Sequence, residues 1–230
     1  MKGPIVGLVD MWQAEWWLTA FLVLLATFVF VLNPVIALTP FRIQGQPVIT
    51  FFFSLILIAG ILSVTGSPVV KFVGIVLVAA TILFHWLQHL VHGTAMAALS
   101  AVFSILGLGF MCGVVLFQTF KKGPITMHRI QGAVAVYLML GLVWSFAYDL
   151  VELQSPGSFQ AANPMLPHGA LLYFSFTTLT TVGYGDITPV HPVARSLVNL
   201  EQLVGQLFPV ILIGRMVAME LESKLRRREP

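Results

Sequence analysis

Long stretches without a charged side chain constrain this sequence more than any other feature. Residues 16–41, 43–70, 72–120 and 130–148 contain no Asp, Glu, Lys or Arg. A helix that crosses the hydrocarbon core of a bilayer needs about 20 apolar residues, so the stretch 72–120 is long enough for two helices and a turn. With 58% hydrophobic and only 9% charged residues, the composition excludes an ordinary cytosolic enzyme, a secreted disulfide scaffold and a disordered chain. The sequence predicts an integral membrane protein.

Six membrane-spanning helices are predicted, which makes the fold class an all-α membrane protein. The apolar runs are apolar on every side instead of alternating with polar residues, and this excludes the strands of a membrane barrel. Turn-forming residues separate the runs, among them Ser67-Pro68 and Gly123-Pro124. The predicted helices are 16–38, 48–64, 69–90, 96–117, 130–150 and 195–217.

Basic residues predict the orientation of these helices, because they gather on the cytoplasmic side of a membrane. If the N-terminus is cytoplasmic, ten of the twelve Lys and Arg residues lie on that side, and only Arg42 and Arg195 lie outside. Both termini are therefore expected in the cytoplasm, and the protein in the plasma (cell inner) membrane. The basic residues flank helices instead of forming one patch, so anionic lipid head groups are expected contacts and nucleic acid is not.

The segment 151–194, between the last two predicted spans, has an unusual pattern. It begins polar at 152–157 and becomes apolar again at 169–179. This second run is too short to cross a membrane, and the chain must enter and leave on the same side. We predict a re-entrant helix over 169–180, packed inside the protein instead of against lipid.

The residues directly after the predicted re-entrant helix are Thr181-Val182-Gly183-Tyr184-Gly185, followed by Asp186. A dehydrated cation needs a shell of oxygens, and backbone carbonyls supply one without fixed charge. Successive carbonyls point to the same side only if the backbone alternates in hand, which glycine tolerates best. One chain contributes one strip of such oxygens, so a closed ring needs several copies.

This motif resembles the selectivity filter of potassium channels, and the resemblance extends over the helix–loop–helix unit 130–217. It implies a potassium channel superfamily member that acts as a homotetramer, conducts K+ passively, is not an enzyme, and needs no cofactor besides K+ ions in the filter. The filter residues would be Thr181, Val182, Gly183, Tyr184 and Gly185. The residues that match the positions supporting the filter are Tyr173, Phe174, Thr177 and Asp186.

The last predicted span contains the other candidate pore residues. By resemblance, Gly205 occupies the position of the inner-helix hinge, and Pro209 follows it and removes a helix hydrogen bond. Helical spacing places Gln206, Ile213 and Val217 on one stripe with Pro209, and they are candidates for the pore lining and gate. Glycine and proline could instead serve only close helix packing, and this alternative stays open. Glu201 lies off the stripe and is expected to form hydrogen bonds behind the filter.

The first four predicted helices resemble the voltage sensor of six-span potassium channels, without its charges. The fourth, 96–117, has no Lys or Arg, and the second and third have no Asp or Glu. We therefore predict little or no intrinsic voltage sensing. The predicted domain boundaries are an N-terminal segment 1–15, a voltage-sensor-like domain 16–117, a linker 118–129, a pore domain 130–217 and a basic tail 218–230. In the pore domain, the outer helix is 130–150 and the inner helix 195–217.

Three histidines support a different hypothesis about the function. His85, His89 and His92 are spaced to share one helix face, where imidazoles could bind a metal or respond to pH. Interfacial side chains next to Trp86 would have the same spacing. The alternatives to a potassium-selective channel are therefore a weakly selective cation channel and a histidine-based metal- or redox-binding membrane bundle.

Overall fold

The computed structural model describes residues 4–32, 35, 45–63, 67–91, 93–120, 126–161, 166 and 169–226. Within 4–15, 45–46, 222–223 and 225–226 it describes the backbone only. His92, the Gly123-Pro124 turn and Arg42 lie outside the described residues, as do 1–3 and 227–230 at the two ends.

Helices dominate the described part of the chain, in agreement with the predicted fold class. Their order along the chain is α1 (Pro4–Thr27), the π-helical turn η1 (Phe28–Leu32), α3 (Gly45–Ser63), α4 (Pro68–Leu90), α5 (Thr94–Thr119), α6 (Met127–Gln154), α7 (Ala170–Leu179) and α8 (Pro192–Arg226). Two short strands, β1 (Phe159–Ala161) and β2 (Ile187–Pro189), flank α7 in the sequence and pair antiparallel. In the described residues, α4, α5, α6 and α8 are long and apolar enough to cross a membrane, and Trp16–Leu32 and Pro47–Ser63 are shorter apolar helices.

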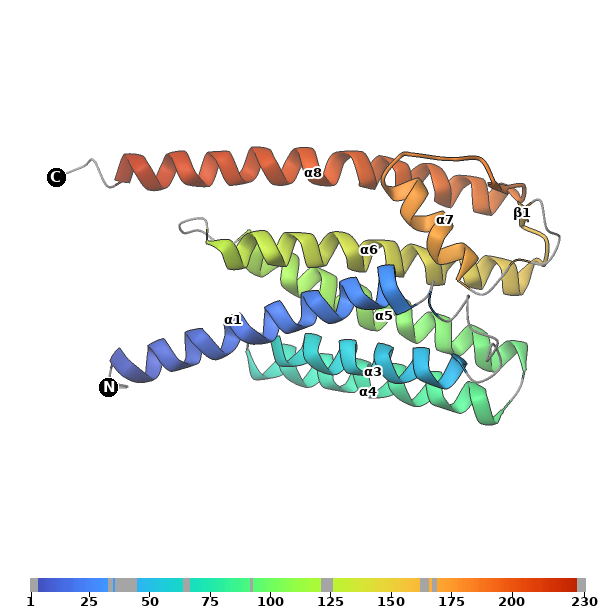
Figure 1. The fold of residues 1–230 in the computed structure, drawn as a ribbon, viewed down its shortest axis with the longest axis horizontal. Coiled ribbons are helices and arrows are strands. Elements are labelled where there is room, and N and C mark those ends of the chain that lie inside the picture. The colour runs from blue at the N-terminus through green and yellow to red at the C-terminus, as the bar shows by residue number, and fades with distance from the viewer. Residues whose placement is uncertain are drawn as a thin grey trace.

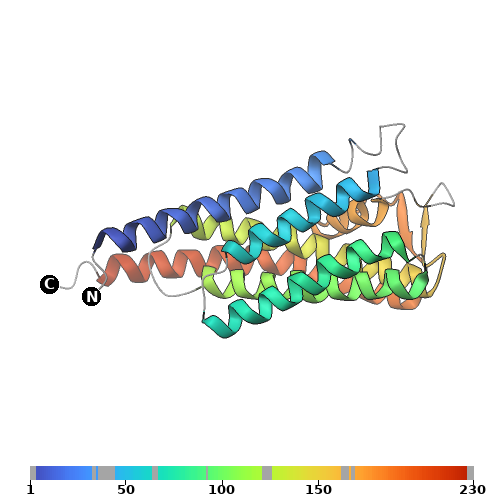
Figure 2. The same cartoon turned by 90° about the horizontal axis from the view of Figure 1, so that it is seen from below.

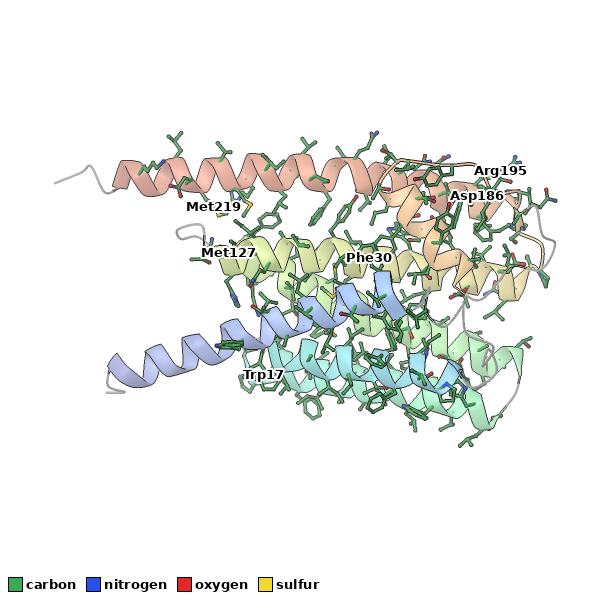
Figure 3. All side chains as sticks on the ribbon, in the orientation of Figure 1. Trp17, Phe30, Met127, Asp186, Arg195 and Met219 are labelled. Carbon is green, nitrogen blue, oxygen red and sulfur yellow. The ribbon has the colours of Figure 1, made fainter. Side chains whose placement is uncertain are left out.

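The long helices lie side by side in one elongated bundle (Figure 1). Both termini are at one end of this bundle, and β1 with the connections to α7 is at the opposite end. The view from below agrees with this arrangement (Figure 2). Figure 3 shows Asp186 and Arg195 at the end that carries β1, and Met127 and Met219 toward the end that carries the termini. The chain thus places the filter motif at the end away from its own termini.

The helix ends differ from the predicted spans at both ends of the chain. α1 begins at Pro4, well before the predicted start at 16, and α8 continues to Arg226 instead of ending at 217. The apolar pattern marks only the part of a helix that suits lipid, and a helix can continue beyond it. Glu220 and Lys224, for example, continue α8 with an ion pair between consecutive turns. Between α5 and α6 the helix is interrupted, since α5 ends at Thr119 and α6 begins at Met127.

One hydrophobic core joins the first four helices to α6. Fully buried side chains from α1, α3, α5 and α6 meet in it, including Phe21, Phe53, Leu108 and Met139. Small residues allow the close approach of helices, since a Cβ on Gly132 of α6 would lie 2.9 Å from the hydroxyl of Thr119 in α5. α1 and α5 therefore pack against the α6 helix of their own chain, and α3 and α4 pack against α1, α5 and each other.

Candidate ion-conducting site

The short apolar helix α7 lies between α6 and α8, as predicted for a re-entrant element (Figure 1). It starts after Gly169, whose φ of 78° is in the left-handed region that glycine accepts. It ends at Leu179, and the backbone N–H and the hydroxyl of the next residue, Thr180, both donate to the carbonyl of Phe176. Seven of its ten residues are buried, so the helix is held by protein on several sides.

The backbone after α7 alternates in hand residue by residue. Thr181, Gly183 and Gly185 have φ of 58°, 56° and 80°, whereas Val182 and Tyr184 between them have negative φ. This alternation is the backbone form required if successive carbonyls are to line one side of a strip. Thr181 is the only non-glycine residue with positive φ in the described part of the chain, and a side chain in this region costs on the order of 1–3 kcal/mol.

Hydrogen bonds fix the start of this strip to the end of α7. The N–H groups of Val182 and Gly183 both donate to the carbonyl of Thr177, at 2.9 and 3.1 Å, and the N–H of Thr181 donates to Thr178. The side chains of Val182 and Tyr184 are exposed within the single chain, at 53% and 71%. The start of the strip is therefore hydrogen-bonded to α7, whereas two of its side chains are not covered by the rest of the chain.

The four predicted supporting residues have different surroundings. Tyr173 is 42% exposed in the single chain, and the Asp186 carboxylate accepts the N–H of Ile187 at 3.1 Å. Phe174 is buried and packs against the ring of Tyr148, with centroids 5.3 Å apart. The Thr177 hydroxyl donates to the carbonyl of Phe174 in its own helix, so Thr177 contacts the filter strip through its backbone carbonyl.

A small sheet of β1 and β2, which the sequence pattern does not predict, lies next to the filter motif. Phe159 pairs with Pro189 and Ala161 with Ile187, and the carbonyl of Ser158 accepts the N–H groups of Val190 and His191. Strands of three residues are too short for an alternating pattern to be detected in a sequence. The sheet connects the segment after α6 to the segment after the filter motif.

Glu201 of α8 is completely buried behind α7, in agreement with the hydrogen-bonding role expected from the sequence. Its carboxyl group is hydrogen-bonded to the hydroxyl of Tyr148 in α6 and lies 2.6 Å from the Ser175 hydroxyl in α7. The Ser175 hydroxyl is also 2.8 Å from the carbonyl oxygen of Gly141. These contacts connect α6, α7 and α8 behind the filter.

Gly205 lies at the closest contact between α8 and α7. A Cβ on this residue would overlap the carbonyl oxygen of Leu179 and lie 2.8 Å from its carbonyl carbon. The same oxygen accepts a hydrogen bond from the Tyr137 hydroxyl at 3.1 Å. α8 is a continuous helix through Gly205 and Pro209. This structure thus gives Gly205 a packing function, and its function as a hinge stays a prediction.

The predicted pore stripe of α8 is uncovered in the single chain. Gln206, Ile213 and Val217 are exposed, and Pro209 is partly buried. Leu203, Leu207 and Val210 are also more than half exposed, so the uncovered surface extends beyond the predicted stripe.

His85 and His89, the two candidate histidines that the structure describes, form hydrogen bonds to different helices. The Nδ1 atom of His85 is 2.9 Å from the Ser100 hydroxyl in α5, and the Nε2 atom of His89 is 2.8 Å from the Thr50 hydroxyl in α3. Among the residues that the structure describes, no three His, Cys, Asp or Glu side chains are close enough to hold a metal ion. His85 and His89 thus have structural partners, and nothing in the described part supports a metal centre there.

Comparison with known proteins finds that part of the chain is similar to ion channels. Residues 136–221 match a family model described as "Ion channel". The inward rectifier potassium channel Kirbac3.1 of Paramagnetospirillum magnetotacticum is 37% identical over 88 residues, which are 36% of this chain and 26% of the relative. Two pore potassium channel c of Oryza sativa subsp. japonica is 35% identical over 102 residues, which are 44% of this chain and 21% of the relative.

The chain thus spans about a quarter of the length of these two relatives. Protein LctB of Bacillus caldotenax is 46% identical over 46 residues, which are 20% of this chain and 34% of the relative. No solved structure matches the chain. The segment 136–221, which contains most of α6, all of α7, the filter motif and most of α8, is thus similar to ion channels, which are not enzymes, and potassium channels are among its relatives, in agreement with the resemblance found in the sequence.

Proposed function

We propose that this protein is a potassium-selective channel that conducts K+ passively through a homotetrameric pore. The observation that carries the proposal is the alternating backbone at Thr181, Gly183 and Gly185, attached by hydrogen bonds to the end of a buried re-entrant helix. Such a strip can offer successive carbonyl oxygens to a dehydrated cation. The C-terminal end of α7 adds partial negative charge next to it, which favours a cation.

The surface that one chain leaves exposed supports assembly of several copies, and the resemblance of the filter motif to potassium channels supports four. One strip supplies one side of an ion's shell, and the side chains of Val182 and Tyr184 are more than half exposed in the single chain. The exposed apolar side chains of α8, among them Leu203, Ile213 and Val217, would be covered by neighbouring α8 helices or would line the pore. We propose six spans per subunit, with both termini cytoplasmic and the protein in the plasma membrane, because most basic residues then lie inside.

Reconstitution tests the proposed function directly. With purified protein in a planar bilayer and opposing KCl and NaCl solutions, the reversal potential should lie near the K+ equilibrium potential. A reversal potential near zero would instead favour the weakly selective cation channel. The size of the conducting species should be that of four subunits, and a smaller one would contradict the proposed assembly.

We expect at most shallow voltage dependence. α5 contains no Lys or Arg, and α3 and α4 contain no Asp or Glu. Each elementary charge that crosses the membrane field contributes about 2.3 kcal/mol per 100 mV, so a helix without charge gains no comparable energy. Conductance measured over about 200 mV, across which each charge would contribute about 5 kcal/mol, should change gradually. A steep curve accompanied by gating currents would contradict this prediction.

A further inference from the structure

Glu201 is the only acidic residue that is fully buried in the described part of the chain. It lies where three helices meet, bonded to Tyr148 of α6 and Ser175 of α7. No Lys, Arg or His of the described residues forms an ion pair with it. A buried carboxylate without a cation is strongly unfavourable, so the protonation state of this group needs an explanation.

The hydrogen bonds around Glu201 require one more proton than the two hydroxyl groups supply. Three pairs of oxygen atoms are in close contact: Tyr148 with Glu201, Ser175 with Glu201, and Ser175 with the carbonyl of Gly141. Each hydroxyl carries one proton, and a carbonyl oxygen carries none. Two protons cannot bridge three contacts, and the unbridged pair would repel. A proton on the Oε1 atom of Glu201 supplies the third bridge.

With this proton in place, each of the three contacts becomes a hydrogen bond with one donor and one acceptor. Tyr148 donates to Oε2 of Glu201, Oε1 donates to Ser175, and Ser175 donates to the Gly141 carbonyl. Ser175 lies two residues before Thr177 in α7, and the Thr177 carbonyl accepts the N–H groups of Val182 and Gly183. The network therefore fixes the part of α7 that supports the filter strip.

We propose that Glu201 is a neutral carboxylic acid and a positioning residue for the filter. It fixes α7 against α6 and α8 through Ser175 and Tyr148, and it contributes no charge to the pore. The proposed effect on selectivity rests on the function proposed above, whereas the protonation state does not.

Three variants test whether Glu201 acts as a neutral acid that positions the filter. Glu201→Gln keeps an oxygen to accept from Tyr148 and gains an N–H group to donate to Ser175, so its K+/Na+ permeability ratio should stay within about twofold of wild type. Glu201→Met has a similar volume but leaves Tyr148 and Ser175 without their partner. Its permeability ratio should fall about tenfold, because unpaired buried polar groups are unfavourable and α7 would move to relieve them. Tyr148→Phe removes one donor and should give an intermediate decrease in a better folded protein.

Infrared spectroscopy measures the proton independently of conduction. The wild-type spectrum minus the Glu201→Gln spectrum, taken at neutral pH, should contain the carbonyl band of a protonated carboxylic acid, and this band should shift in D2O. A carboxylate band in its place would overturn the neutral acid. A loss of selectivity in Glu201→Gln as large as in Glu201→Met, or unchanged selectivity in both Glu201→Met and Tyr148→Phe, would overturn the positioning role. If wild type does not select K+, the proposed function fails, and the infrared result still decides the protonation state.

Discussion

Replacing Gly205 by alanine is expected to abolish potassium current and to destabilise the protein. The added Cβ would overlap the Leu179 carbonyl oxygen, and this oxygen belongs to backbone that cannot rotate away as a side chain would. Overpacking of this kind costs roughly 1–3 kcal/mol per subunit, or more where backbone must move. α8 and the end of α7 would have to separate, which displaces the residues that support the filter. Bilayer current and the thermal stability of the purified protein measure the two effects.

Gly214→Ala is the matched control, because it lies in the same helix with open space around its missing side chain. This variant should keep its current, and its stability should be unchanged or higher, since alanine favours helix over glycine by about 1 kcal/mol. The comparison also separates the two roles of Gly205. A hinge alone predicts that Gly205→Ala changes opening without lowering thermal stability, and that result would contradict the packing function.

Replacing Gly183 by alanine is expected to lower the K+/Na+ permeability ratio at least tenfold or to eliminate current. The φ of 56° at this position is unfavourable for any residue with a Cβ. The cost is about 1–2 kcal/mol per residue, and in the proposed tetramer it is incurred four times around one ring. The backbone would relax toward negative φ and turn its carbonyl away. Reversal potentials in opposing KCl and NaCl measure the change.

Gly157→Ala controls for backbone strain outside the filter. Gly157 has a φ of 85° and open space around it, as Gly183 does, but it lies in the loop between α6 and β1. Its substitution should destabilise the protein by a similar amount and leave ion selectivity unchanged. Equal loss of selectivity in both variants would mean that Gly183 acts through general stability and not through the pore.

The apolar helices and the short helix α7 were predictable because each is indicated by a pattern within its own stretch of sequence. Uninterrupted apolar residues predict a helix in lipid, and the shortness of 169–179 predicts that it turns back. The alternating backbone could also be expected, since glycine at 183 and 185 favours positive φ. Helix ends were less predictable. The apolar pattern stops at the lipid boundary, whereas α1 and α8 continue through residues that favour helix in water.

The contacts of Gly205 and Glu201 could be predicted only in part. The position of Glu201 off the pore stripe indicated a buried polar role, but its partners Tyr148 and Ser175 lie on two other helices. The sequence contains no sign that Gly205 meets the Leu179 backbone, because this contact depends on how α7 and α8 cross. The paired strands were missed for a related reason, since each is held by a partner across α7.

The shared core of α1, α3, α5 and α6 has a consequence for the order of assembly. Each newly made subunit can complete this apolar interior from its own chain, before it meets another copy. In the proposed tetramer, neighbouring subunits would cover the exposed face of α8 and complete the ring of filter strips. A subunit separated from this proposed tetramer would therefore stay folded in the bilayer and lose only its ion sites, and oligomerisation would be the step that creates the pore.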